Sequence, residues 1–217
     1  MTLLRTSVGR RPGILVLRAA LLAMLISSSF AHENATGQAD SPRTSSATVT
    51  WARNYPIPAV RLIRDDGKEV SLAEEINDGR PVVLNFIFTT CSSICPLMSQ
   101  TFAQFDRKLG AERAQVHLMS ISIDPEEDTV PRLREYARKF HAGPEWQHYT
   151  STVEASLAAQ RAFNVWRGDK MSHAPITFVR AAPGTPWLRI EGFVTPDELL
   201  QQYHHLLEQS GQAVATR

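Results

Sequence analysis

The strongest constraint on the fold is an apolar run that ends close to two cysteines. Residues 81–88 read Pro-Val-Val-Leu-Asn-Phe-Ile-Phe, a composition typical of a strand buried on both faces of a parallel or mixed sheet. The only two cysteines of the chain follow as Cys91 and Cys95, and Cys95 precedes Pro96. Proline suits the first position of a helix and disfavours helical angles in the residue before it. The sequence therefore predicts a strand, a loop with Cys91, and a helix with Cys95 at its N-cap.

The predicted position of the cysteines at a helix N-terminus affects the ionisation of their thiols. The unpaired amides and the positive dipole end at a helix N-terminus favour a thiolate, the form that attacks disulfides and binds soft metals. Two outcomes stay open for Cys91 and Cys95. They close a disulfide if their Cα atoms lie within about 7 Å, or they separate to hold an ion. Two incidental buried cysteines are a weaker interpretation, because the pair is close in sequence and the chain has the features of an exported protein.

Export is predicted from the N-terminus. Residues 1–31 combine four arginines, a short apolar stretch over residues 19–26 and the small-residue pattern Ser29-Phe30-Ala31, the layout of a secretory signal peptide. An uncleaved membrane anchor is the alternative, although a spanning helix needs about 20 apolar residues. We therefore expect a periplasmic or extracytoplasmic protein, attached to the membrane only if this segment stays uncleaved.

The remaining chain is predicted to hold one domain. Residues 32–48 form a polar tether without apolar periodicity, which indicates disorder, and residues 49–217 have the length of a single domain with a proper core. The formal net charge of the 217-residue chain is +1 and its basic residues are scattered. Nucleic-acid binding is therefore not expected.

The order of elements predicts a thioredoxin-like α/β fold, with a central mixed sheet flanked by helices and an N-terminal β-hairpin. The hairpin turns at Asp66-Gly67, a dipeptide that favours tight turns. Apolar periodicity and capping residues indicate the other elements. Strands are expected near residues 81–88, 116–123, 145–149, 176–179 and 188–193, and helices near 72–77, 96–109, 129–140, 153–163 and 195–207.

His173 is the candidate third ligand of a metal site. It lies shortly before Pro175, where a thioredoxin fold has its cis proline in the loop that faces the cysteines. Two thiolates and an imidazole suit copper, since sulfur holds Cu(I) and added nitrogen makes Cu(II) tenable. The alternative is a loop histidine bonded to the backbone. The other histidines after the tether are expected on the solvated surface: His117, His141, His148, His204 and His205.

An acidic turn follows the second apolar strand. It reads Asp-Pro-Glu-Glu-Asp-Thr over residues 124–129 and leaves the carboxyl edge of the sheet, where α/β proteins place their sites. Asp124 either orients a ligand or belongs to a simple helix-entry turn, and the sequence leaves both open. Asp128 or Thr129 is expected to be the N-cap of the next helix.

The motifs together resemble the SCO/SenC family of thioredoxin-like copper proteins. The resemblance covers about residues 60–207 and is carried by the hairpin, by the block from Asn85 to Pro96, by the block from Ser122 to Thr129, and by a single histidine before a late strand. It implies that Cys91, Cys95 and His173 bind copper. It also implies a role in building the copper A centre of cytochrome c oxidase, by delivering copper or by keeping the target cysteines reduced.

Two departures from the family pattern keep a second function open. Many members have proline after the first cysteine and aspartate before the histidine, where this chain has Ser92 and Ser172. An altered neighbour of a ligand changes the affinity of a metal site. The alternative function is an extracytoplasmic thiol–disulfide oxidoreductase that uses Cys91 and Cys95. The expected partner is the copper-binding subunit of cytochrome c oxidase or another copper or thiol protein.

Overall fold

The computed structural model describes residues 47–211. The predicted signal peptide and all but the end of the predicted tether lie outside the described residues. Among the helices of the described part, none is long and apolar enough to cross a membrane.

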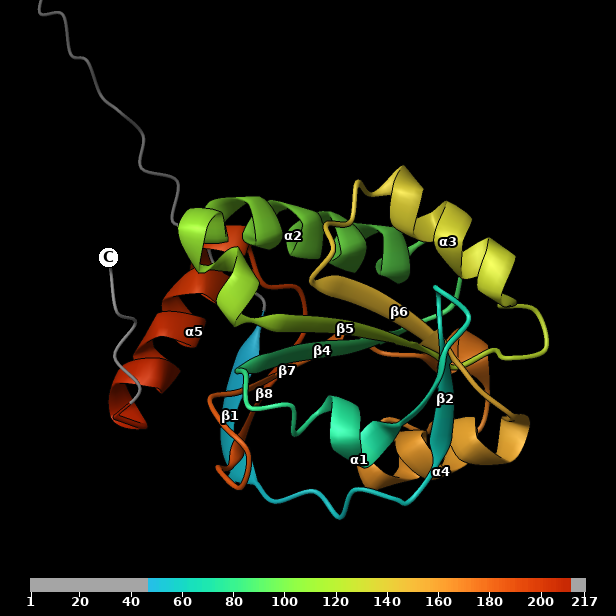
Figure 1. The fold of residues 1–217 in the computed structure, drawn as a ribbon, viewed down its shortest axis with the longest axis horizontal. Coiled ribbons are helices and arrows are strands. Elements are labelled where there is room, and N and C mark those ends of the chain that lie inside the picture. Colours follow the sequence, from blue (N-terminus) through green and yellow to red (C-terminus); the bar gives the residue numbers. More distant parts are fainter. Residues whose placement is uncertain (1–46, 212–217) are drawn as a thin grey trace, which may run out of the picture. The chain divides into compact units, whose positions relative to one another are not determined.

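The described strands form one eight-stranded sheet in the order β1-β8-β7-β4-β5-β6-β2-β3 (Figure 1). The strands are β1 (Thr48–Arg53), β2 (Arg61–Arg64), β3 (Glu69–Ser71), β4 (Val82–Ile87), β5 (His117–Ser122), β6 (Trp146–Thr150), β7 (Ile176–Arg180) and β8 (Trp187–Glu191). Strands β4, β5 and β6 are parallel, and the remaining pairings are antiparallel. The predicted mixed sheet is confirmed.

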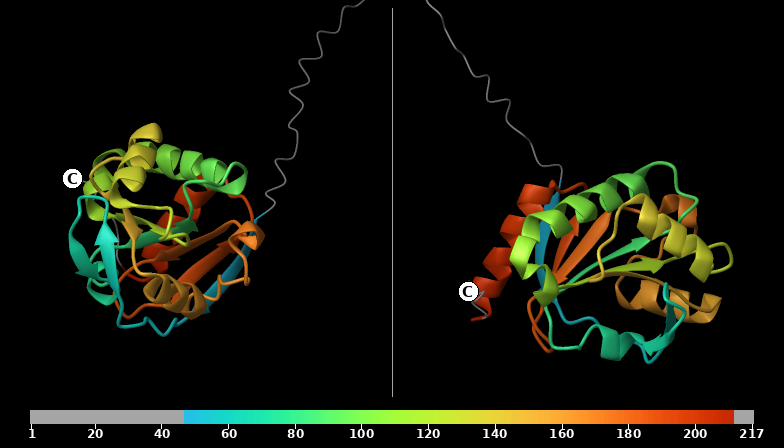
Figure 2. Two further views of the ribbon diagram at one scale, coloured as in Figure 1. Left: turned by 90° about the vertical axis from the view of Figure 1, so that its right-hand side faces the viewer. Right: turned by 45° about the horizontal axis from the view of Figure 1, so that its top comes forward.

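Helices cover both faces of the sheet (Figures 1 and 2). Helices α2, α3 and α5 lie on one face, and α1 and α4 lie on the other. Two short 3₁₀ segments, η1 and η2, were not predicted. The bounds are α1 (Leu72–Glu75), α2 (Ile94–Leu109), η1 (Gly110–Gln115), α3 (Val130–Lys139), α4 (Val153–Ala162), η2 (Lys170–Ser172) and α5 (Pro196–Gln209).

Strand β4 is fully buried and contributes side chains to two apolar cores. Val83 and Ile87 belong to the cluster under α2 and α5, whereas Val82, Leu84 and Phe86 belong to the cluster beside α1 and α4. Because successive side chains of a strand point to opposite faces, a strand covered on both faces must be apolar throughout. This requirement explains the uninterrupted run and fixes the point at which the cysteine loop leaves the sheet.

The N-terminal region differs from the prediction in one element. The hairpin β2–β3 is confirmed, with Leu62 opposite Val70. Strand β1, however, begins at Thr48 and pairs antiparallel with β8 at the edge of the sheet, where the sequence analysis expected the last tether residue and no strand. An edge strand has one neighbour only, so its sequence lacks the long apolar run that identified β4.

Helix α5 begins as predicted. The Thr195 hydroxyl accepts a hydrogen bond from the Glu198 amide at 3.2 Å, and the Glu198 carboxylate accepts one from the Thr195 amide at 2.8 Å. This reciprocal capping box satisfies two amides that have no partner inside the helix. Leu199, Tyr203 and Leu207 then bury one side of the helix against the sheet.

Replacing Thr195 by alanine should lower the free energy of unfolding by about 1 kcal/mol, since a lost N-cap exposes unpaired amides. The melting temperature should fall by about 2–4 °C, measured by circular dichroism. Glu208→Ala, in the last turn of the same helix, is the control and should not destabilise the protein. Equal melting temperatures for Thr195→Ala and wild type would contradict a stabilising role for the cap.

Candidate metal and thiol site

The site is built at the carboxyl edge of the parallel strands. Strands β4 and β5 pair in parallel from Val82 opposite His117 to Ile87 opposite Ser122, and the Ile123 amide donates to the Ile87 carbonyl at 2.9 Å. The segments that follow β4 and β5 therefore leave the sheet side by side. The loop after β4 carries Cys91, and the loop after β5 carries the acidic turn.

Helix α2 begins earlier than predicted. Its first residue is Ile94 and its N-cap is Ser93, whose side chain makes no capping hydrogen bond. Cys95 and Pro96 are therefore inside the first turn, and the expected N-cap position of Cys95 is wrong. The reason is that every amide of the first turn lacks a partner within the helix, so a proline there removes no helical hydrogen bond.

The Cys91 sulfur provides the missing cap. It accepts a hydrogen bond from the Cys95 amide at 3.4 Å, in the place where a capping side chain would bond to a first-turn amide. Burial alone would raise the pKa of Cys91, but hydrogen bonds from the amides of Cys95 and Ser93 outweigh it and lower the pKa. The helix N-terminus thus favours the thiolate of Cys91.

The pKa of Cys95 is shifted in the opposite direction from that of Cys91. The Cys95 side chain is fully buried in the core under α2, and burial raises its pKa far above the ordinary value, with a further increase from the neighbouring Cys91. The thiolate expected at this helix N-terminus is therefore favoured at Cys91 and not at Cys95, and the structure holds both cysteines as free thiols. The site has one half-exposed, acidic thiol and one buried, protonated thiol.

Asp128 connects the two loops, a role that the sequence analysis did not predict. Its carboxylate accepts hydrogen bonds from the Thr89 hydroxyl at 2.5 Å, the Thr89 amide at 3.1 Å and the Ser122 hydroxyl at 2.6 Å. Asp128 is completely buried, and burial raises its pKa despite these bonds. The N-cap of α3 is Thr129, one of the two residues expected there, and Asp128 has this other role. The sequence feature that could have predicted this contact was the acidic turn itself, because it follows a strand that pairs in parallel with β4.

Asp124 lies in the same turn and binds a different loop. Its carboxylate forms an ion pair with Lys170 of η2 at 2.6 Å. Lys170 lies three residues before His173, so the acidic turn contacts the cysteine loop through Asp128 and the histidine loop through Asp124.

His173 follows η2 and is half-buried. Its Nε2 lies 2.9 Å from the Phe86 carbonyl oxygen, and its ring meets that of Phe88 edge-on with centroids 6.3 Å apart. A carbonyl only accepts, so Nε2 carries the proton and donates. Burial lowers the pKa of His173, which favours the neutral ring and leaves a lone pair on Nδ1. Pro175 is in the trans form, since no described peptide bond is cis, and the expectation of a cis proline is wrong.

The structure brings Cys91 and Cys95 together but does not gather His173 with them into a complete metal site. Within residues 47–211, no three histidine, cysteine or acidic side chains form a group that could hold a metal. Phe88 lies between the two parts of the predicted site: its ring meets that of His173, and it belongs to the same buried apolar cluster as Cys95.

The remaining histidines divide into three groups. His141 and His205 are exposed, as expected. His204 is half-buried, and its Nε2 lies 2.9 Å from the Glu112 carboxylate. His117 and His148 are buried, contrary to the surface expectation. Both lie in strands of the sheet, β5 and β6, and the apolar neighbours Val116, Leu118 and Trp146 were the available signal of their burial.

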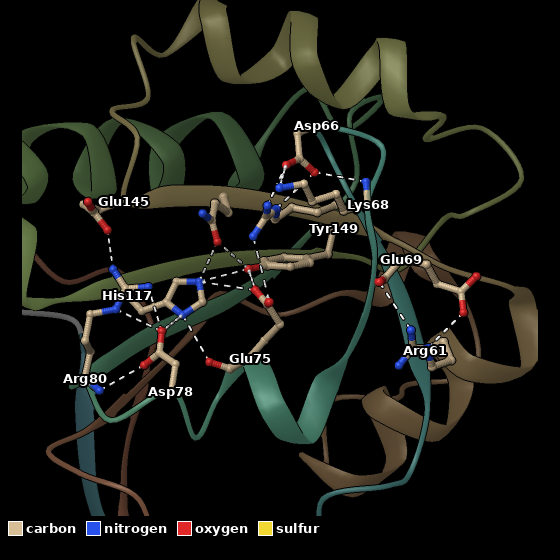
Figure 3. Close-up of polar contacts among 12 residues, drawn as sticks. Arg61, Asp66, Lys68, Glu69, Glu75, Asp78, Arg80, His117, Glu145 and Tyr149 are labelled. Carbon is tan, nitrogen blue, oxygen red and sulfur yellow. Dashed lines mark hydrogen bonds and ion pairs between the residues drawn. The ribbon is translucent and has the colours of Figure 1, made fainter.

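His117 lies in a polar network at the amino end of β5 (Figure 3), whereas the cysteines follow the carboxyl end of the parallel strand β4. Its Nε2 lies 2.9 Å from the Tyr149 hydroxyl, and its Nδ1 lies 3.1 Å from the Asp78 carboxylate. The Tyr149 hydroxyl in turn donates to Glu75 at 2.6 Å. These hydrogen bonds satisfy the polar ring of His117 inside the protein and therefore account for its burial. At the amino end of β5, His117 is away from the thiols.

Comparison with known proteins places these features in one family. An SCO1 protein homolog of Bacillus subtilis is 37% identical over 87 residues, a segment that covers 40% of this chain and 44% of that relative. The match thus spans less than half of the relative's length. Copper-bound ScoI of Arabidopsis thaliana has the same fold with a TM-score of 0.59 and 26% identity, covering 69% of this chain and 96% of that chain.

A further match is BsSco, a member of the Sco family of cytochrome c oxidase assembly proteins in which a disulfide switch has been identified. It is 24% identical with a TM-score of 0.59, and the match covers 72% of this chain and 96% of that chain. At this identity the likeness supports the fold alone. The model of the family SCO1/SenC matches residues 57–208, from before β2 into α5. The chain therefore belongs to the SCO1/SenC family.

Proposed function

We propose that this protein is a copper metallochaperone of the extracytoplasmic space that binds copper through Cys91, Cys95 and His173. It delivers copper to the copper A centre of cytochrome c oxidase or keeps the cysteines of that centre reduced. The observation that carries the proposal is the pair of free thiols at the start of α2, with the Cys91 sulfur on the Cys95 amide at 3.4 Å.

The donor set suits copper. Thiolate sulfur is a soft ligand that selects Cu(I), and imidazole suits copper in either oxidation state. Metal binding displaces thiol protons, and the lowered pKa of Cys91 makes the first displacement easy. Cys95 has a raised pKa, so its proton leaves only as copper binds.

The hydrogen bond of His173 supports its assignment as a ligand. A metal-binding histidine commonly donates its other ring N–H to a backbone carbonyl or a carboxylate, which fixes the ring and its tautomer. His173 makes such a bond from Nε2 to Phe86. Nδ1 is then the atom left to bind copper. Because the described side chains do not yet form a three-ligand group, the proposal requires the His173 loop to close on the thiols when copper binds.

The surface near the site supports transfer to a protein partner. Three of the exposed large apolar side chains lie in or next to segments that carry the site: Leu97 in the first turn of α2, Met171 in η2, and Phe193 after β8. The loop of Phe193 is held beside Pro175 by a hydrogen bond from the Gly192 amide at 2.8 Å. These exposed apolar side chains are the candidate contacts for a protein partner.

A thiol–disulfide oxidoreductase is the second candidate, and the asymmetry of the two thiols favours it. The attacking thiol of such a protein is accessible to solvent and has a low pKa. Cys91 is half-exposed and its pKa is lowered. Cys95 is buried four residues away, in a position to resolve a mixed disulfide. Both functions require reduced thiols and therefore can coexist in one protein.

Titration of the reduced protein with copper tests the first proposal. Wild type should bind one copper per chain with a thiolate-to-copper charge-transfer band when loaded as Cu(II). Cys91→Ser and Cys95→Ser should abolish the band, since each removes a sulfur ligand. His173→Ala should shift the band and weaken binding by at least about tenfold, while His205→Ala, an exposed control, should match wild type. A reduced wild-type protein that binds no copper would overturn the proposal.

The pH dependence of alkylation tests the thiol asymmetry. A lowered pKa means that the thiolate of Cys91 is populated at a lower pH than that of an ordinary cysteine, so its reaction with iodoacetamide should reach its plateau earlier on the pH scale. Native Cys95 should stay unmodified over the same range because it is buried and protonated. Peptide mass spectrometry resolves the two sites. Faster modification of Cys95 than of Cys91 would contradict the assignment of Cys91 as the attacking thiol.

A further inference from the structure

The buried carboxylate of Asp128 has no role in the copper chemistry proposed above, yet it contacts the loop on which that chemistry depends. Asp128 is completely buried and bonds to Thr89 twice, through the hydroxyl at 2.5 Å and through the amide at 3.1 Å. Thr89 lies two residues before Cys91. A bond to both the side chain and the backbone of one residue fixes its position and its backbone direction together.

Thr89 lies inside the turn that places both sulfurs. The Cys91 amide closes this turn by donating to the Phe88 carbonyl at 3.2 Å. The first residue of the turn, Phe88, lies with Cys95 in the same buried apolar cluster. The last residue, Cys91, accepts the Cys95 amide at 3.4 Å. A shift of the turn would therefore move one thiol relative to the other.

Asp128 is itself held in place from β5. The Ser122 hydroxyl donates to Asp128 at 2.6 Å and accepts the Asp124 amide at 3.0 Å, and the Asp128 amide donates to the Asp124 carbonyl at 2.8 Å. Ser122 is the last residue of the fully buried strand β5. The turn of Cys91 is thus attached to the rigid centre of the sheet through two consecutive side chains.

We propose that Asp128 is the positioning residue of the thiol site: it fixes the Phe88–Cys91 turn through Thr89 and so sets the separation and the unequal exposure of Cys91 and Cys95. This inference deepens the proposed function, and the copper-affinity test of it rests on that proposed function. The expected effect of Asp128 on the two thiols of the copper-free protein does not depend on the proposed function.

The alkylation ratio of the two cysteines at one fixed pH tests positioning without copper. In reduced wild type, Cys91 should react and fully buried Cys95 should not. Asp128→Asn keeps the size of the side chain but cannot accept from Thr89 and Ser122 on both atoms. The loosened turn should expose Cys95, so that the ratio of Cys91 to Cys95 modification falls several-fold, measured by peptide mass spectrometry. Asp106→Asn, a buried aspartate at the other end of α2 that pairs with Arg113 at 3.0 Å, is the matched control and should keep the wild-type ratio.

A second pair of variants keeps the test valid if Asp128→Asn does not fold. Thr89→Val removes the hydroxyl that bonds Asp128 and should lower the alkylation ratio, whereas Thr89→Ser retains the hydroxyl and should restore it. The double variant with Asp128→Asn should change the ratio no more than the larger single change, because both act on one contact.

Copper affinity adds a readout that loss of stability alone would not change. Changing a residue that orients a metal ligand commonly weakens binding by about 10–100-fold, and we expect a loss of this size for Asp128→Asn, with a shifted charge-transfer band. A variant with a lowered melting temperature but wild-type alkylation ratio, affinity and spectrum would show that Asp128 only stabilises the fold and would overturn the inference. If wild type bound no copper, the proposed function would fail while the alkylation ratio still decided the role of Asp128.

Discussion

The parallel pairing of β4 with β5 is the constraint on which the rest of the site depends. It makes two loops leave one edge of the sheet together, so that an acidic turn lies beside the cysteine loop. Helix α2, which begins between the two cysteines, then points the Cys95 amide at the Cys91 sulfur. A thiolate site arises here from backbone geometry, with a helix N-terminus in place of a basic side chain.

The same geometry makes the two thiols unequal. One sulfur accepts helix amides at the surface and the other is buried under α2, so their pKa values move in opposite directions. Such inequality would suit both of the proposed functions. Thiol exchange and copper binding each require one accessible thiolate and a second thiol close to it.

The fold could be predicted from the sequence because its clearest patterns allow one local structure only. The run before Cys91 had to be a doubly covered strand, and Thr195 with Glu198 had to cap a helix. Sequence reasoning failed where the outcome depends on tertiary contacts. The first residue of α2 was misplaced because a proline fits anywhere in a first turn, and the role of Asp128 depends on a partner 39 residues away. The burial of His117 depends on Asp78 and Tyr149, which no local pattern connects.

The central claim is that Cys91, Cys95 and His173 together bind one copper ion. The most direct test is copper-edge X-ray absorption of the Cu(I)-loaded protein, with His173→Ala for comparison. Our account predicts two sulfur scatterers and one nitrogen scatterer in wild type, and loss of the nitrogen in the variant. A first shell of sulfur alone in wild type, or an unchanged nitrogen contribution in His173→Ala, would contradict it.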